Sequence, residues 1–144
     1  MRRFGAPPKP GRRYRTRPGA YVILADKRGV LLTHQARPVP EFQLPGGGID
    51  PGEHTVPALH REVMEETGWT MSPPTRLGVW RRFTYMPEYD LWADKICTIY
   101  RARPVLCKGD PIEDGHTAVW ADPRDAIALV SAPGDRAFLQ RFFP

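Results

Sequence analysis

Residues 47–69 read GGIDPGEHTVPALHREVMEETGW and are the most informative part of the chain. One arginine and five acidic residues lie in this segment: Arg61, Asp50, Glu53, Glu62, Glu65 and Glu66. Its formal charge is −4, in a chain of 144 residues whose net charge is +5. Because like charges repel, this density of carboxylates indicates a positive partner, and a divalent metal ion is the obvious candidate.

Helical periodicity brings three of these acids to one side of a helix. Successive helical residues advance by about 100°, so Glu62, Glu65 and Glu66 share an arc of roughly 100°. An apolar stripe borders that arc, formed by Val56, Leu59 and Val63. We therefore expect the carboxylates at the edge of a packed surface, where a ligand can approach.

Particular residues indicate where the helix begins and ends, and glycines characterise the segment before it. We expect His54 or Thr55 as the N-cap, Pro57 in the first turn and Gly68 as the C-terminal stop. Upstream, the glycines of residues 45–48 can expose backbone groups without obstruction by side chains. Mg²⁺ prefers carboxylate, carbonyl and water oxygens, which a glycine loop beside convergent acids supplies.

The segment matches the pattern G-x5-E-x7-R-E-U-x-E-E-x-G-U, in which U is a bulky apolar residue, and so resembles the Nudix hydrolases. All nine specified positions agree: Gly47, Glu53, Arg61, Glu62, Val63, Glu65, Glu66, Gly68 and Trp69. Trp69 is aromatic where an aliphatic residue is more usual. Without these surroundings, an acidic helix face would be read as a solvated surface.

The resemblance implies an α/β/α sandwich with a mixed β-sheet, whereas the pattern of strands and helices alone supports only an α/β or α+β class. Strands are expected at residues 20–25, 29–35, 41–44, 77–86, 95–103 and 117–121, a loop at 87–94, and further helices at 123–130 and 135–142. The resemblance also implies a hydrolase that uses Mg²⁺ or Mn²⁺ to cleave a diphosphate bond in a nucleoside diphosphate linked to another moiety.

By the same resemblance, Glu62 and Glu66 are the principal metal ligands, and Glu65 is a further ligand or one that acts through water. A carbonyl of Gly46 or Gly47 is expected to complete the metal shell. Either Glu62 or Glu66 could serve as the base, because neighbouring carboxylates titrate jointly and the sequence does not separate their roles.

Three further residues are candidates around the metal. Arg61 is expected to orient Glu53 or Glu65, with a phosphate contact as the alternative, and Glu53 is expected to anchor the loop. Family members often supply one more acid from outside the motif, and Glu113 is the best match. Its rivals are Asp110 and Asp114, and a polar surface loop is the other interpretation.

Substrate contacts are assigned from charge and aromaticity. Arg37, Lys95 and one of the adjacent Arg81 and Arg82 are candidates for phosphate; successive strand residues face opposite sides, and Arg81 is our choice. The aromatic residues that could stack a base, or instead belong to the core, are Trp80, Phe83 and Tyr85. The four histidines show no zinc-ligand spacing and are read as structural or surface residues, although His116 is of interest because it follows Glu113.

Positive charge is concentrated at the N-terminus. Residues 1–18 contain seven Lys/Arg, four prolines and no acid, and are predicted to be an extended or disordered arm before a domain at 19–144. The arm could bind nucleic acid, or be a solvated tail. No apolar run approaches the roughly 20 residues that span a membrane, so a cytoplasmic protein with reduced Cys97 and Cys107 is expected.

The identity of the substrate is open at this level. A nucleoside triphosphate or an oxidised nucleotide is the first choice. The alternatives are ADP-ribose, a dinucleoside polyphosphate, the 5′ end of RNA, and, in another class, a non-catalytic nucleotide- or RNA-binding module. A homodimer, common in the family, is a possible assembly.

Overall fold

A mixed β-sheet forms the centre of the computed structural model, which describes all residues 1–144. Its strand order is β1 (Arg2–Arg3), β7 (Thr75–Met86), β8 (Leu91–Ala102), β2 (Arg15–Asp26), β3 (Gly29–Gln35) and β10 (His116–Ala121). Two short strands attach to it, β4 (Glu41–Gln43) to β3 and β5 (Gly46–Gly48) to β2. A separate two-stranded sheet consists of β6 (Trp69–Met71) and β9 (Pro104–Cys107).

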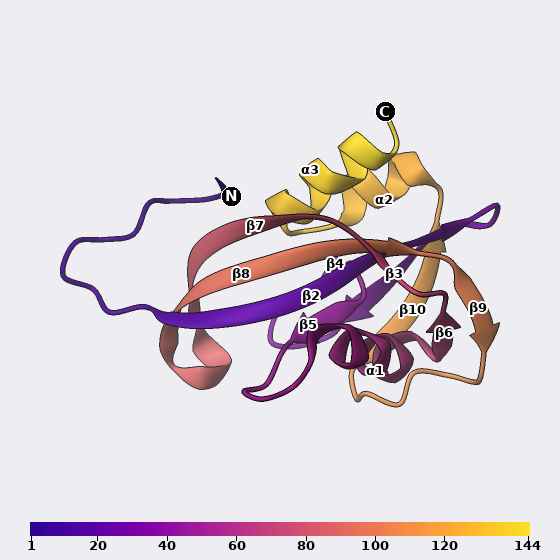
Figure 1. Ribbon diagram of the computed structural model, residues 1–144, viewed down its shortest axis with the longest axis horizontal. Coiled ribbons are helices and arrows are strands. Elements are labelled where there is room, and N and C mark those ends of the chain that lie inside the picture. Colours follow the sequence, from indigo (N-terminus) through magenta and orange to yellow (C-terminus); the bar gives the residue numbers. More distant parts are fainter.

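Helices cover both faces of the large sheet (Figure 1). On one face, α1 (Thr55–Thr67) packs Leu59 and Val63 against apolar side chains of β2 and β3. On the other face, α2 (Pro123–Leu129) and α3 (Pro133–Phe142) bury a second core cluster that includes Phe138 and Leu139. The expected α/β/α sandwich with a mixed sheet is therefore confirmed.

The glycine segment is part of the sheet, although we expected a loop there. β3 pairs with β2 only at Leu24–Asp26, whereas β5 occupies the same edge of β2 opposite Gly19–Tyr21. Between these two pairings, the backbone N–H of Val22 donates to the carbonyl oxygen of Pro45 at 3.0 Å. The ladder hydrogen bonds fix Gly46–Gly48 beside α1.

The β7–β8 hairpin is longer than the sequence indicated. The predicted loop at 87–94 is wrong beyond Asp90, because a short 3-10 turn at Pro87–Tyr89 is followed directly by β8 from Leu91. Asp90 closes the turn with a φ of 45°, a conformation that Asp tolerates better than most residues. Asp94, which suggested a loop, lies in the strand and is neutralised by Arg81 of β7.

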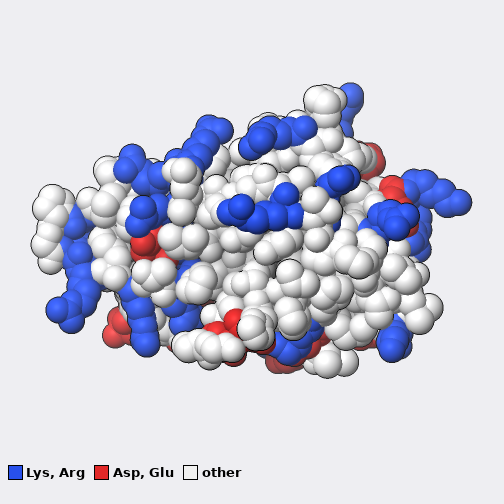
Figure 2. Space-filling view, viewed as in Figure 1, with Lys and Arg blue, Asp and Glu red and all other residues white.

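The basic N-terminal segment lies against the sheet. β2 begins at Arg15, so the last four residues of the predicted arm belong to a strand that pairs in parallel with β8. At the other end, Arg2–Arg3 pair in parallel with β7, and the ring of Phe4 meets Trp80 edge-on. Figure 2 shows Lys and Arg side chains at the left of the molecule, and others across the centre, along the top and at the right.

None of the helices has the length and apolar character needed to span a membrane. Both cysteines are free thiols: Cys97 is buried in the core, and Cys107 is exposed at the end of β9.

Candidate active site

The ends of α1 fix the direction of its carboxylates. The helix begins after His54, which adopts an extended conformation and makes no side-chain cap. It ends at Gly68, whose N–H donates to the carbonyl oxygen of Met64 at 2.9 Å and whose φ of 79° turns the following chain away from the helix. With Leu59 and Val63 buried against the sheet, the adjacent acidic arc meets the glycines of β5.

Two carboxylates face the glycine segment from partly buried positions. Glu66 is 4% exposed and accepts the backbone N–H of Gly46 at 2.9 Å. Glu62 lies so close to Gly47 that a Cβ atom there would stand 2.8 Å from its carboxyl carbon. Burial raises the pKa of Glu66 to about 9 and the pKa of Glu62 to about 7. A cation bound between these groups would offset the cost of burying their charge.

Arg61 joins the helix to the loop that precedes it. Its Nε and Nη2 atoms donate to Glu53 at 3.0 and 2.8 Å, and its Nη1 atom donates to Glu65 at 3.2 Å. Glu53 in turn accepts the backbone N–H of Asp50 at 3.1 Å. This network orients Glu65 and holds the loop, and it leaves Glu66 uncompensated.

The loop before β10 and the first residue of β10 each add one group to the cluster. The backbone N–H groups of Ile112 and Glu113 donate to the carbonyl oxygen of Glu65 at 3.0 and 2.9 Å, which fastens the loop to the end of α1. Three carboxylates, those of Glu62, Glu65 and Glu113, each offer one oxygen, and these oxygens lie within 4.8 Å of one another. The same is true of Glu66, Glu113 and His116, so Glu113 belongs to both sets.

His116 belongs to this cluster, although the sequence analysis gave it no role beyond noting that it follows Glu113. The Nδ1 atom of His116 lies 3.9 Å from Glu66 and 2.9 Å from the hydroxyl of Thr33. Its Nε2 atom lies 3.9 Å from Glu113. The signal was its spacing, three residues after Glu113 at the start of a strand. Mainly oxygen donors with one imidazole suit Mg²⁺ or Mn²⁺.

A cleft of about 560 Å³ opens beside the carboxylates. Its walls come from β5, the β7–β8 hairpin and the loop before β10, and Glu62, Glu66, Glu113 and His116 line one side. Lys95 and Tyr85 line it as predicted candidates, and the Tyr85 hydroxyl donates to Asp90.

The other two predicted phosphate contacts do not line the cleft. Arg81 pairs with Asp94 at 2.7 Å, and its neighbour Arg82 lines the cleft in its place. Arg37 pairs with Asp114 at 2.8 Å on the exposed surface. Strand alternation had allowed only one of Arg81 and Arg82 to face the site, and the pairing of β7 with β8 determines which one does.

A deeper branch of about 270 Å³ continues from the cleft towards α3. Tyr21, Arg82 and Lys95 line both spaces, and Asp135 lies in the inner one. Asp135 is buried, accepts the indole N–H of Trp80 at 3.3 Å, and has its pKa raised by burial to about 7. The sequence analysis did not identify Asp135 or Tyr21 as site residues. An acid in the first turn of a helix and a tyrosine in a strand are both common, so neither attracts notice.

The raised pKa values predict how the metal-free protein responds to pH. A carboxyl whose folded pKa exceeds its usual value keeps a proton that the unfolded chain has released, so the stability of the fold decreases as pH rises through that window. For Glu66 the window runs from 4.5 to about 9. We expect the melting temperature in EDTA to fall by several degrees between pH 5 and 9. Glu66→Gln should remove a large part of this slope, and Glu62 and Asp135, whose pKa values burial also raises to about 7, should account for the remainder. An unchanged slope would contradict the assignment.

Comparison with known proteins agrees with this geometry. The family model described as the NUDIX domain matches residues 15–142. A Bacillus subtilis protein named "Putative 8-oxo-dGTP diphosphatase" is 36% identical over 78 residues, which cover 54% of this chain and 52% of that protein. An RNA pyrophosphohydrolase of Cereibacter sphaeroides is 43% identical over 54 residues, covering 36% and 33%. The chain thus spans about half and a third of the lengths of these relatives.

A solved structure shares the fold over nearly its whole length. The NUDIX hydrolase from Nitrosomonas europaea superposes with a TM-score of 0.73, covering 90% of this chain and 89% of that one at 18% identity. At this identity the likeness concerns the fold.

Proposed function

Because the chain belongs to the NUDIX domain family, we propose that it is a metal-dependent hydrolase that cleaves a diphosphate bond in a nucleoside triphosphate, oxidised forms included. One observation carries the proposal: Glu62, Glu65, Glu66 and Glu113 converge at one side of a cleft in which Arg82 and Lys95 also lie. Hydrolysis of a diphosphate needs both parts, a site for a divalent ion and cations for the phosphates.

The carboxylate cluster would hold the metal. Glu66, fixed by the N–H of Gly46, has no Lys or Arg partner. Glu62, packed against Gly47, has only a long contact of 3.4 Å with the Nη1 atom of Arg61. When bound, Mg²⁺ or Mn²⁺ neutralises phosphate charge and lowers the pKa of an attacking water. Arg61 keeps Glu65 in position beside this group.

The protein's own side chains would then orient the substrate and move the proton. Arg82 and Lys95 bind phosphate oxygens and place the scissile bond beside the acids. Glu62, Glu66 or Glu113 accepts the proton of the attacking water. His116, 3.9 Å from Glu113, restricts where the Glu113 carboxylate lies. The inner branch has room for the nucleobase of the substrate, and the carboxyl of Asp135 would be its hydrogen-bonding partner.

The adjacent arginines provide a matched pair of variants for this arrangement. Arg82→Ala should raise KM by about tenfold, because it removes one charge-assisted phosphate contact. Arg81→Ala should leave KM unchanged and lower the melting temperature, because it leaves Asp94 unpaired in a buried position. Steady-state kinetics and thermal unfolding of both variants measure this difference. Equal KM values for the two variants would remove Arg82 from the site.

The 5′ end of RNA is a second candidate substrate, favoured by the N-terminal segment. The guanidinium of Arg12 stacks on Trp92 at 3.7 Å, and that of Arg17 stacks on Tyr89, a residue of the cleft rim, at 4.9 Å. Basic and aromatic side chains in a row are typical of surfaces that bind single strands.

A panel of substrates separates these candidates. Phosphate release would be followed with dNTPs, oxidised dGTP, ADP-ribose, diadenosine polyphosphates and 5′-triphosphate RNA, with Mg²⁺ or Mn²⁺ and with EDTA. We expect metal-dependent turnover of a nucleoside triphosphate that survives replacement of Arg12 and Arg17 by alanine. Turnover of RNA alone, lost in that double variant and steeply dependent on salt, would favour the second candidate. Binding without turnover anywhere would favour a non-catalytic module.

A further inference from the structure

A second hollow lies at the opposite end of β8 from the cleft. The cleft includes Pro87–Tyr89, which precede the start of β8. The second hollow includes Arg101 and Arg103, which lie at the end of β8. Its volume is about 500 Å³, and it shares no lining residue with the cleft. The hollow is therefore not part of the metal-binding cluster or of its cleft.

One side of this hollow carries positive charge without a partner. Arg101 and Arg103 are exposed, and neither takes part in any ion pair of the structure. Asp26, the acid in the lining, is already bonded to Arg28. The hydroxyl of Ser72 accepts the backbone N–H of Arg103 at 2.9 Å, so its own proton is available to a ligand. Two guanidinium groups and a hydroxyl thus provide donors for an anion.

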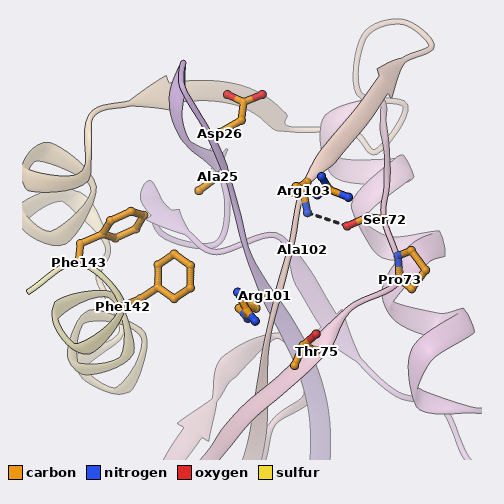
Figure 3. Close-up of a pocket in the computed structure, with 10 residues that line it drawn as sticks. All are labelled: Ala25, Asp26, Ser72, Pro73, Thr75, Arg101, Ala102, Arg103, Phe142 and Phe143. Atoms are coloured by element: carbon orange, nitrogen blue, oxygen red, sulfur yellow. Dashed lines mark hydrogen bonds between the residues drawn. The ribbon is translucent and has the colours of Figure 1, made fainter.

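The facing wall is aromatic. Phe142 and Phe143, at the end of α3, lie across the hollow from Ser72, Pro73 and Thr75, with Arg101 between them (Figure 3). The two phenyl rings pack edge to face, with centroids 4.7 Å apart, and both are only partly buried. Their exposed parts offer contacts to a flat ring.

We propose that this hollow is a ligand site for a small anion that carries a flat ring, of the class of the nucleoside monophosphates. Arginine binds phosphate oxygens through two parallel N–H groups, and a base packs on phenyl rings. The volume falls within the roughly 300–1,000 Å³ of small-molecule sites. The binding requires no residue of the cleft, so it does not depend on the hydrolysis proposed above.

Titration of the ¹⁵N-labelled full chain with AMP, in EDTA and followed by NMR, tests the proposal. AMP should cause saturable shifts of the backbone amides of Ser72, Arg101 and Arg103. Inorganic phosphate and adenosine, each offering half of the ligand, should bind at least about tenfold more weakly. The double replacement of Arg101 and Arg103 by alanine should weaken AMP binding at least tenfold, whereas Arg124→Ala, an exposed arginine of α2, should not.

The same titration contains the results that overturn the proposal. These are AMP shifts confined to the cleft, no saturation, equal binding of phosphate alone, or full AMP affinity in the double variant. Should the double variant fail to fold, Arg103→Gln alone must still weaken binding by several-fold. Turnover of the panel substrates should be unchanged in these variants, so a failure here is distinguishable from a failure of the proposed hydrolysis.

Discussion

Glu66→Gln should lower kcat by at least about 10³-fold while the protein stays folded. Glutamine keeps the shape of the side chain, and its carbonyl oxygen can still accept the N–H of Gly46. It cannot bear the negative charge that a divalent ion requires of its principal ligand. With a pKa raised to about 9, Glu66 must take up a proton on folding at pH 8, which costs stability. Glutamine avoids this cost, so the variant should be at least as stable as the wild type at pH 8 without metal.

Asp125→Asn is the control for this variant. Asp125 is exposed on α2, which packs on the face of the sheet opposite α1, and it does not line the cleft. The same change of charge there should alter kcat less than about twofold. Rates are measured at saturating substrate and metal. Similar losses in both variants would mean that the overall charge, and not the metal site, limits turnover.

Gly46→Ala should destabilise the fold by roughly 3–5 kcal/mol and abolish turnover. A Cβ atom on Gly46 would stand 2.1 Å from the carbonyl oxygen of Ala20 and 2.7 Å from the Cα of Tyr21, both backbone atoms of β2. Its φ of 144° is also a conformation that side chains disfavour. Because neither neighbour can rotate away, β5 must leave the sheet, and Glu66 loses its backbone donor.

Gly52→Ala separates steric contact from backbone strain. Gly52 has a φ of 83°, but an added Cβ atom there meets nothing within 4 Å. Its cost should be about 1 kcal/mol, with turnover retained. Urea unfolding of both variants gives the comparison. A Gly46 variant as stable as the Gly52 variant would show that β5 is not held as the structure has it.

The sequence predicted the helix and its carboxylates because local rules govern both. Helical periodicity sets the arc shared by Glu62, Glu65 and Glu66. Gly68 ends the helix through its own left-handed conformation, whatever packs around the helix. Glu113 was proposed because the resemblance implies one more acid from a loop outside the motif, and the structure brings it to the cluster. These inferences needed no knowledge of long-range pairing.

The errors concern features that depend on pairing between distant segments. Nothing local shows that β2 offers an edge to Gly46–Gly48, so three glycines read as a loop. The choice between Arg81 and Arg82 needs the register of β7 on β8, and Asp94 reads as a loop residue until Arg81 is seen beside it. His116 joins the site only because β10 pairs with β3, where Thr33 meets its ring.

The most direct measurement of the central claim is Mn²⁺ binding, followed by the loss of the free-ion signal in electron paramagnetic resonance. It needs no knowledge of the substrate. The metal-free wild type, with a non-hydrolysable nucleotide present, should bind Mn²⁺ saturably, and Glu66→Gln should weaken that binding at least about tenfold relative to Asp125→Asn. No saturable binding by the wild type, or equal binding by Glu66→Gln, would contradict the assignment of this cluster as the metal site.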